Sequence, residues 1–203
     1  MIDNAPEVYV PPYSVRVDIE THGTDAHRHP ILQIGAVAFN GEFQMHDTFD
    51  ACLSIPGDRK PSPETVQWWQ ETDPDLYQEL CDKEEPYEAV LKRFADWLPS
   101  WPYLWAWPAC FDLAFIRLYA KDYSIAGLEK KMHPYRWIDC RSWIAGLRRD
   151  LVTDQEIEKL TKEPPPFSGR IHDGLYDARW QVVCLQRVAD LVAEREANRT
   201  PKT

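Results

Sequence analysis

Three β-type segments open the chain, and their position before any helical pattern is the strongest constraint on the fold. They are rich in β-branched and aromatic residues and cover residues 15–20, 31–39 and 48–55. Asn40-Gly41, between the second and third segments, is a typical hairpin turn. The opening of the chain is therefore predicted to be an antiparallel meander.

Helical patterns then alternate with shorter apolar runs. Helices are predicted to begin near Ser62, Pro86, Phe111, Asp139 and Asp173, with short strands at 103–107 and 136–138. The last helix, residues 173–196, is long and amphipathic. A meander followed by alternating helices and strands predicts an α/β fold, with a mixed sheet of five strands flanked by helices.

The length of the chain suits one hydrophobic core. It has 203 residues, 44% of them hydrophobic, and shows no internal repeat and no linker. We therefore predict a single domain over residues 1–203. The Pro-rich lead-in, residues 1–13, and the tail, residues 197–203, are expected to be flexible.

The cysteines and the N-terminus predict a cytoplasmic protein. The five cysteines are scattered, odd in number and without a CxxC pair, which favours free thiols in a reducing compartment. No basic region followed by an apolar run opens the chain, so a signal peptide is not expected. No apolar stretch approaches the ~18 residues of a membrane span, so no membrane partner is expected.

The net charge of −10 argues against a protein that coats nucleic acid, since such binding depends on cations. The charge is uneven, however. Residues 112–149 hold eight Lys or Arg and four acids, a net charge of +4, which leaves −14 on the remainder. This basic segment could contact a phosphate backbone, or it could be a solvated helix surface.

Two acids lie close together in the first β-type segment. In a strand, Asp18 and Glu20 point to the same face, while Val15, Val17 and Ile19 point to the other. Adjacent carboxylates repel each other, and a hard divalent cation such as Mg²⁺ or Mn²⁺ removes that conflict. Such triplets are also common in acid-rich chains, so this pair alone is a weak indication of a site.

Two further groups carry candidate chemistry. Asp112 lies where a short strand is followed by a helix, the kind of junction at which ligands of α/β sheets gather. His172 and Asp177 lie just before and just inside the last helix, so both can face one cleft. A histidine can accept a proton from water near neutral pH. Taken singly, each has an ordinary capping or surface interpretation.

Together these residues resemble the motifs of the DEDDh 3′–5′ exonucleases. The run Asp18-Ile19-Glu20-Thr21-His22-Gly23 resembles their first motif, Phe111-Asp112 the second, and His172 with Asp177-Ala178 the third. The resemblance spans residues 15–190 and implies a ribonuclease H-like fold.

Within that superfamily, the chain is similar to the small phage-type exonucleases related to the T4 DexA enzyme and to bacterial exoribonucleases. Thr65-Val66-Gln67-Trp68-Trp69 and Asp139-Cys140-Arg141 carry this similarity. The chain departs from the pattern at Trp107-Pro108-Ala109-Cys110, where Asn or a small residue is usual. That departure bears on substrate preference.

The resemblance implies a two-metal phosphodiester hydrolase. Asp18, Glu20, Asp112 and Asp177 would hold two Mg²⁺ or Mn²⁺ ions, and His172 would take the proton of the attacking water. The expected substrate is single-stranded nucleic acid with a free 3′ end, degraded to nucleoside monophosphates. The predicted substrate-binding residues are Thr21, His22, Trp68, Trp69, Phe111 and Arg141.

Several alternatives stay open. Adjacent helical residues point about 100° apart, so one of Trp68 and Trp69 is expected in the core and the other beside a base. Arg141 either contacts phosphate or pairs with an acid. DNA and RNA are not distinguished, and exposed tryptophan permits a homodimer without requiring one. The alternative function is a catalytically silent nucleic-acid-binding accessory domain with the same fold.

Overall fold

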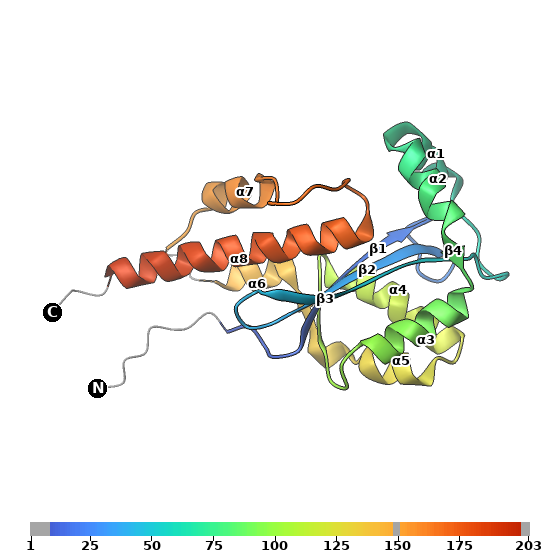
Figure 1. Cartoon of the computed structure of the whole chain (residues 1–203), viewed down its shortest axis with the longest axis horizontal. Helices are drawn as coiled ribbons and strands as arrows, with labels where there is room; N and C mark the ends of the chain where they lie inside the picture. The colour runs from blue at the N-terminus through green and yellow to red at the C-terminus, as the bar shows by residue number, and fades with distance from the viewer. Residues whose placement is uncertain (1–8, 148–150, 200–203) are drawn as a thin grey trace.

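The computed structural model describes residues 9–147 and 151–199 (Figure 1). Within this part of the chain, one sheet has the strand order β4-β3-β2-β1-β5-β6. Its strands are β1 (Ser14–Thr21), β2 (Ile31–Phe39), β3 (Met45–Leu53), β4 (Glu84–Glu85), β5 (Tyr103–Ala106) and β6 (Trp137–Asp139). The helices are α1 (Pro63–Thr72), α2 (Pro74–Asp82), α3 (Tyr87–Trp97), α4 (Ala109–Asp122), α5 (Ala126–Lys131), α6 (Cys140–Gly146), α7 (Asp154–Lys162) and α8 (Gly174–Arg199), with a 3-10 turn over Pro134–Arg136.

The predicted meander and mixed sheet are confirmed. Strands β1, β2 and β3 pair antiparallel, whereas β5 pairs parallel with β1 and β6 parallel with β5. The predicted number of five strands is wrong, because the described sheet has six. The additional strand is β4, whose two residues pair parallel with Cys52 and Leu53. Two residues are too few to produce a periodic pattern in the sequence.

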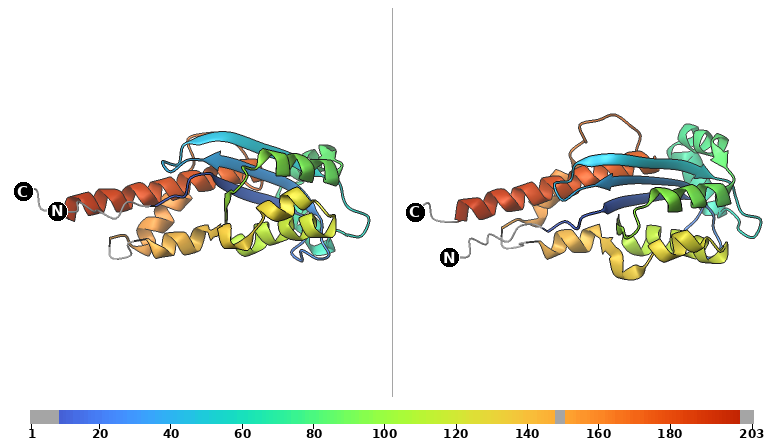
Figure 2. Two further views of the ribbon diagram at one scale, coloured as in Figure 1. Left: turned by 90° about the horizontal axis from the view of Figure 1, so that it is seen from below. Right: turned by 60° about the horizontal axis from the view of Figure 1, so that its bottom comes forward.

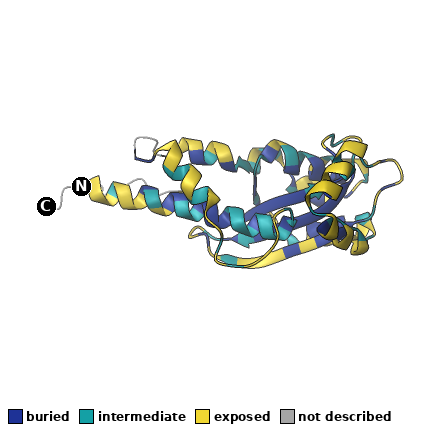
Figure 3. Cartoon of the chain, turned by 90° about the horizontal axis from the view of Figure 1, so that it is seen from above, coloured by how far each residue is buried: buried dark blue, intermediate teal, exposed yellow. Residues whose placement is uncertain are grey.

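Helices cover both faces of the sheet (Figure 2). On one face, α3, α4 and α5 close a core that takes in the apolar residues of β1: Val15, Val17 and Ile19. On the other face, α6 and α8 pack over Phe39 and Trp105. The buried strands between outward-facing exposed helix surfaces are visible in Figure 3. Strand β1, at the centre, therefore has an apolar face and a face on which polar groups can meet α8.

Two glycines let α8 approach the sheet directly. A Cβ atom at Gly35 of β2 would lie 2.1 Å from the backbone of Gly174, the first residue of α8. The N–H of Gly174 donates to Oε1 of Gln33 at 2.8 Å. This backbone-to-backbone packing fixes the start of α8 against β2, next to the end of β1.

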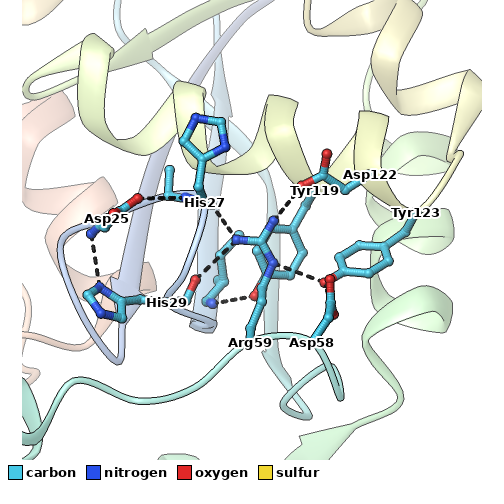
Figure 4. A network of polar contacts seen from close by, with 10 residues as sticks. Asp25, His27, His29, Asp58, Arg59, Tyr119, Asp122 and Tyr123 are labelled. Atoms are coloured by element: carbon cyan, nitrogen blue, oxygen red, sulfur yellow. Dashed lines mark hydrogen bonds and ion pairs between the residues drawn. The ribbon is translucent and has the colours of Figure 1, made fainter.

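A buried arginine joins two loops at one end of the sheet (Figure 4). Arg59 is 3% exposed, lies 4.2 Å from the centre of the Tyr119 ring and pairs with Asp122 at 2.7 Å. It also donates to the carbonyl oxygens of Ala26 and His29. Arg59 thereby attaches both the turn after β1 and the loop before α1 to α4.

The flexibility expected for residues 1–13 and 197–203 stays a prediction. Within these segments, Val10 is buried and α8 continues to Arg199. Residues 1–8 and 200–203 of the predicted flexible ends, and residues 148 and 149 of the basic segment, lie outside the described residues.

The five cysteines are free thiols, as predicted. In the described part of the chain, no helix is both long and apolar enough to span a bilayer.

Candidate active site

The end of β1 places two carboxylates on the face covered by α8. Asp18 is 9% exposed, and Glu20 is half-buried two residues further along. The pairing of β1 with β2 shifts register between Glu20 and Thr21, where Leu32 of β2 is left without a partner in the ladder. Such irregularities are common next to active sites. Asp18 lies within β1, and Glu20 lies near its end, just before the irregularity.

Asp112 reaches the same region from the first turn of α4. It is 4% exposed, and its Oδ1 accepts the backbone N–H of Ile19 at 3.1 Å. Ile19 lies between the two carboxylates of β1, so this hydrogen bond ties Asp112 to the middle of the Asp18–Glu20 motif. The junction predicted from the sequence is thus in contact with the first motif.

The start of α8 brings in a histidine and a fourth carboxylate. His172 has a φ of 69°, in the left-handed region, and its N–H donates to Oδ2 of Asp177 at 2.9 Å. Oδ1 of Asp173 accepts the N–H of Tyr176 at 3.1 Å, so Asp173 caps the helix as expected. A non-glycine residue held in this backbone region is strained, and such residues gather at functional sites.

Three of these side chains form one cluster. Glu20, His172 and Asp177 each offer a ligand atom, and these atoms all lie within 4.8 Å of one another. Asp18 and Asp112 lie beside this cluster and deeper in the protein, where both are buried. The structure therefore brings together all five residues of the three sequence motifs.

Burial and mutual repulsion raise the pKa values of the carboxyl groups. Burial, followed by the charges of Asp18, Asp177 and Asp112, places the pKa of Glu20 well above its ordinary value. Burial and the charge of Asp18 raise the pKa of Asp112 to about 7, and the same two causes raise the pKa of Asp177 to about 7. Such shifts are typical of functional sites, where like charges are held together.

The donor set fits a divalent cation. Oδ1 of Asp177 is buried and has no hydrogen-bond partner among the described residues. Buried polar atoms are normally paired, so an unpaired carboxylate oxygen in a cluster of acids indicates a site for a ligand. Carboxylate oxygens are the donors that Mg²⁺ and Mn²⁺ prefer. A divalent cation would offset the repulsion among the four carboxylates and would give Oδ1 of Asp177 a partner.

A cleft of about 580 Å³ opens beside the cluster. Its walls include Glu20, Thr21, Trp68, Trp69 and Phe111, and also Thr24, His29, Ser62, Glu64 and Thr65. Trp69 is 1% exposed, and its Nε1 donates to the carbonyl oxygen of Thr21 at 3.3 Å. Trp68 is 41% exposed, and its ring centre lies 4.9 Å from that of His172. Both tryptophans line the cleft, but Trp69 is buried in the core, as expected for one of the pair, whereas Trp68 is exposed.

Two predicted substrate-binding residues do not line the cleft. His22 is 1% exposed. Its N–H donates to the carbonyl oxygen of Pro30, and its own carbonyl oxygen accepts the N–H of Ser62, so both backbone groups are already paired within the protein. Its ring contacts the Tyr77 hydroxyl, and burial lowers its pKa to about 4. His22 does not line the cleft, and its role in seating a nucleotide stays a prediction. Arg141 is exposed in the first turn of α6, outside the cleft lining.

Sequence reasoning missed two polar residues that contact Asp18. Nη2 of Arg16 and Nε2 of Gln181 both donate to Oδ1 of Asp18, at 3.1 Å and 3.0 Å. The position of Arg16, two residues before Asp18 on the same strand face, was available as a signal. Gln181 follows Asp177 by one helical turn, which places both on the same side of α8.

Comparison with solved structures shows which proteins share this fold. The nuclease domain of 3′hExo, a DEDDh family member bound to rAMP, is 19% identical with a TM-score of 0.57, covering 92% of this chain and 94% of that one. Exonuclease I is 18% identical with a TM-score of 0.64, covering 89% of this chain and 43% of that one. The zinc-bound complex of E. coli ExoI with single-stranded DNA is 19% identical with a TM-score of 0.61, covering 87% and 40%.

Comparison with curated proteins gives no match. A family model described as the 3′–5′ exoribonuclease Rv2179c-like domain matches residues 13–189. Together with the shared fold of 3′hExo and exonuclease I, this match confirms the predicted resemblance to DEDDh 3′–5′ exonucleases. Similarity to the phage-type enzymes stays a prediction. The chain belongs to the Rv2179c-like 3′–5′ exoribonuclease domain family.

Proposed function

We propose that this protein is a metal-dependent 3′–5′ exonuclease that removes nucleoside monophosphates from single-stranded nucleic acid. The observation that carries the proposal is the cluster of Glu20, His172 and Asp177, whose ligand atoms lie within 4.8 Å of one another at the edge of the cleft. Asp18 and Asp112 would complete the set of acids. RNA is the favoured substrate because the family is described as exoribonucleases.

The acids and the histidine have different roles in this proposal. Asp18, Glu20, Asp112 and Asp177 would hold the divalent cations. When bound, Mg²⁺ or Mn²⁺ supplies Lewis acidity that polarises the scissile phosphate and makes water a stronger acid. His172 would accept the proton of the attacking water. Burial lowers the pKa of His172, which favours the neutral ring that can accept that proton.

The cleft supplies the means to hold one nucleotide. Phe111 and the exposed face of Trp68 offer flat surfaces for a base, and stacking on an aromatic ring contributes about 1–3 kcal/mol per base. Thr21 lines the same cleft, next to Glu20. A base held here would leave the adjoining phosphate close to Glu20, which lines the same cleft. The 3′hExo nuclease domain bound to rAMP and ExoI bound to single-stranded DNA support this class of ligand.

End-labelled strands test the proposal. Single-stranded RNA and DNA of one sequence, labelled at the 3′ or the 5′ end, are incubated with Mn²⁺ and with wild type or Asp18→Ala. The 3′ label is expected to leave at once as mononucleotide, while the 5′-labelled strand shortens stepwise, and Asp18→Ala is expected to abolish both. Binding without cleavage by wild type would favour the accessory-domain alternative instead.

A further inference from the structure

A fully buried arginine lies next to the candidate metal site. Arg16 is 0% exposed, and its Nη2 lies 3.1 Å from Oδ1 of Asp18. Its Nη1 donates to the carbonyl oxygen of Trp105 at 3.1 Å. Among the described residues, no other ion pair involves Asp18, Glu20, Asp112 or Asp177. A buried charge is costly unless it is paired, so the position of Arg16 is bound to that of Asp18.

Gln181, on helix α8, donates to the same oxygen of Asp18 as Arg16, which is on strand β1. Its Nε2 lies 3.0 Å from Oδ1 of Asp18, so Oδ1 accepts two hydrogen bonds. In the described chain, no hydrogen bond reaches the second oxygen, Oδ2. The two donors hold the carboxylate by one oxygen and leave the other available.

Both donors are themselves restrained. Arg16 is opposite Trp105 in the parallel pairing of β1 with β5. Trp105 is fully buried, and its strand lies between β1 and β6, so the carbonyl oxygen that accepts from Nη1 belongs to an interior strand of the sheet. Gln181 lies on α8 beyond the Gly35–Gly174 contact that fixes this helix against the sheet. Rotating the Gln181 amide would turn Oε1 toward Asp18 and set two acceptors against each other. Asp18 therefore fixes the orientation of the amide.

We propose that Arg16 and Gln181 are positioning residues that hold Asp18 by Oδ1 and keep Oδ2 for a divalent cation. This inference rests on the proposed function of the site. Neighbours that orient a ligand commonly change metal affinity by about 10–100-fold when they are removed. Neither residue touches the reacting atoms, because both act through Asp18.

Two variants separate orientation from charge. Arg16→Lys keeps the positive charge but loses the forked guanidinium, which donates to Trp105 and Asp18 at once. Gln181→Leu removes the second donor without changing any charge. Each variant is expected to weaken Mn²⁺ binding, measured by calorimetry on the full chain, by about tenfold or more. Each should also lower kcat at limiting Mn²⁺ while KM for the oligonucleotide changes less than about twofold, because neither residue lines the cleft.

Arg187 provides a matched control on the same helix. Its guanidinium donates to the carbonyl oxygens of Leu160, Glu163 and Pro164 and makes no contact with Asp18. Arg187→Met is expected to lower Tm and to leave Mn²⁺ affinity at the wild-type value. A merely structural role for Arg16 and Gln181 predicts this same pattern for their variants.

The outcomes distinguish failure of the positioning roles from failure of the proposed exonuclease function. If wild type binds Mn²⁺ and degrades RNA, and both variants bind Mn²⁺ as tightly as wild type, the positioning roles are wrong and the proposed function stands. If wild type neither binds Mn²⁺ nor degrades RNA, the proposed function and this inference both fail. Should Arg16→Lys not fold, Gln181→Leu alone decides, since Gln181 is only partly buried.

Discussion

The backbone N–H of His172 donates to Oδ2 of Asp177 across 2.9 Å, which holds the candidate base and a candidate metal ligand as one unit. His172 has a left-handed backbone, with a φ of 69°, in the turn that leads into α8. The ring of His172 is then directed to Trp68, on α1. The start of α8 and the side of α1 thus set the position of His172, the proposed general base.

Replacement of His172 by alanine is expected to lower kcat by about 100-fold or more, the usual contribution of a general base. The backbone N–H that binds Asp177 is retained, so the carboxylates should keep their arrangement and Mn²⁺ affinity should change little. Stopped-time assays and calorimetry measure the two effects. A large loss of Mn²⁺ affinity would instead make His172 a metal ligand, which its closeness to Glu20 and Asp177 allows.

Gly35→Ala should separate α8 from the sheet. The added Cβ would meet the backbone of Gly174 at 2.1 Å, so the helix start must shift together with His172 and Asp177. We expect a loss of about 1–3 kcal/mol in the free energy of unfolding, with a greater proportional loss of activity. Gly57→Ala is the control, because a Cβ there meets no atom within 4 Å. Equal behaviour of the two variants in chemical denaturation would contradict the packing described for α8.

Replacement of the two adjacent tryptophans should affect different properties, stability for Trp69 and substrate affinity for Trp68. Trp69→Ala removes a ring that is 1% exposed and is expected to cost about 3–5 kcal/mol of stability. Trp68→Ala removes a ring that is 41% exposed, so its effect should fall mainly on KM for the oligonucleotide, with a smaller effect on unfolding. Trp68→Phe should restore most of the affinity by keeping a stacking surface. Denaturation curves and steady-state kinetics give the two readouts, and an unchanged KM in Trp68→Ala would exclude stacking.

The thiols provide a test of burial and its pH dependence. Burial raises the pKa of Cys52 to about 12 and that of Cys184 to about 11, from an ordinary value of 9.0. The folded protein therefore keeps protons that the unfolded chain releases, so stability contributed by these groups is lost as pH rises above about 9. At pH 8 only the exposed Cys110 should react rapidly with a thiol reagent. Cys110→Ser should remove that rapid phase, and rapid labelling of Cys52 would contradict its burial.

The long periodic elements could be predicted from the sequence, whereas the shorter helices α2, α5 and α7 were not. The meander and α8 were predicted because long runs of apolar residues repeat at strand or helix spacing. Helix α7 was missed because none of its residues is buried. Its capping box, in which Thr153 and Glu156 bond each other's backbone, was the signal that could have located it.

The carboxylates of the site could be predicted from the sequence, but the residues that hold them in place could not. Asp18, Glu20, Asp112 and Asp177 belong to motifs with fixed spacing, and the fold brings them together. Contacts such as Gln181 with Asp18 join residues 163 positions apart, which no local pattern records. The burial of His22 is a further example, because its position two residues after Glu20 does not reveal the contacts with Pro30 and Ser62 that enclose it.

The central claim is that Glu20 and its neighbouring carboxylates remove nucleotides from a free 3′ end. The most direct measurement follows mononucleotide release from single-stranded RNA that has either a free or a blocked 3′-hydroxyl, in Mn²⁺ and in chelator. Wild type should release mononucleotides only from the free end and only with Mn²⁺, and the isosteric Glu20→Gln should slow release by about 100-fold or more. Release from the blocked strand, or undiminished release by Glu20→Gln, would contradict the proposed metal-dependent 3′–5′ exonuclease activity.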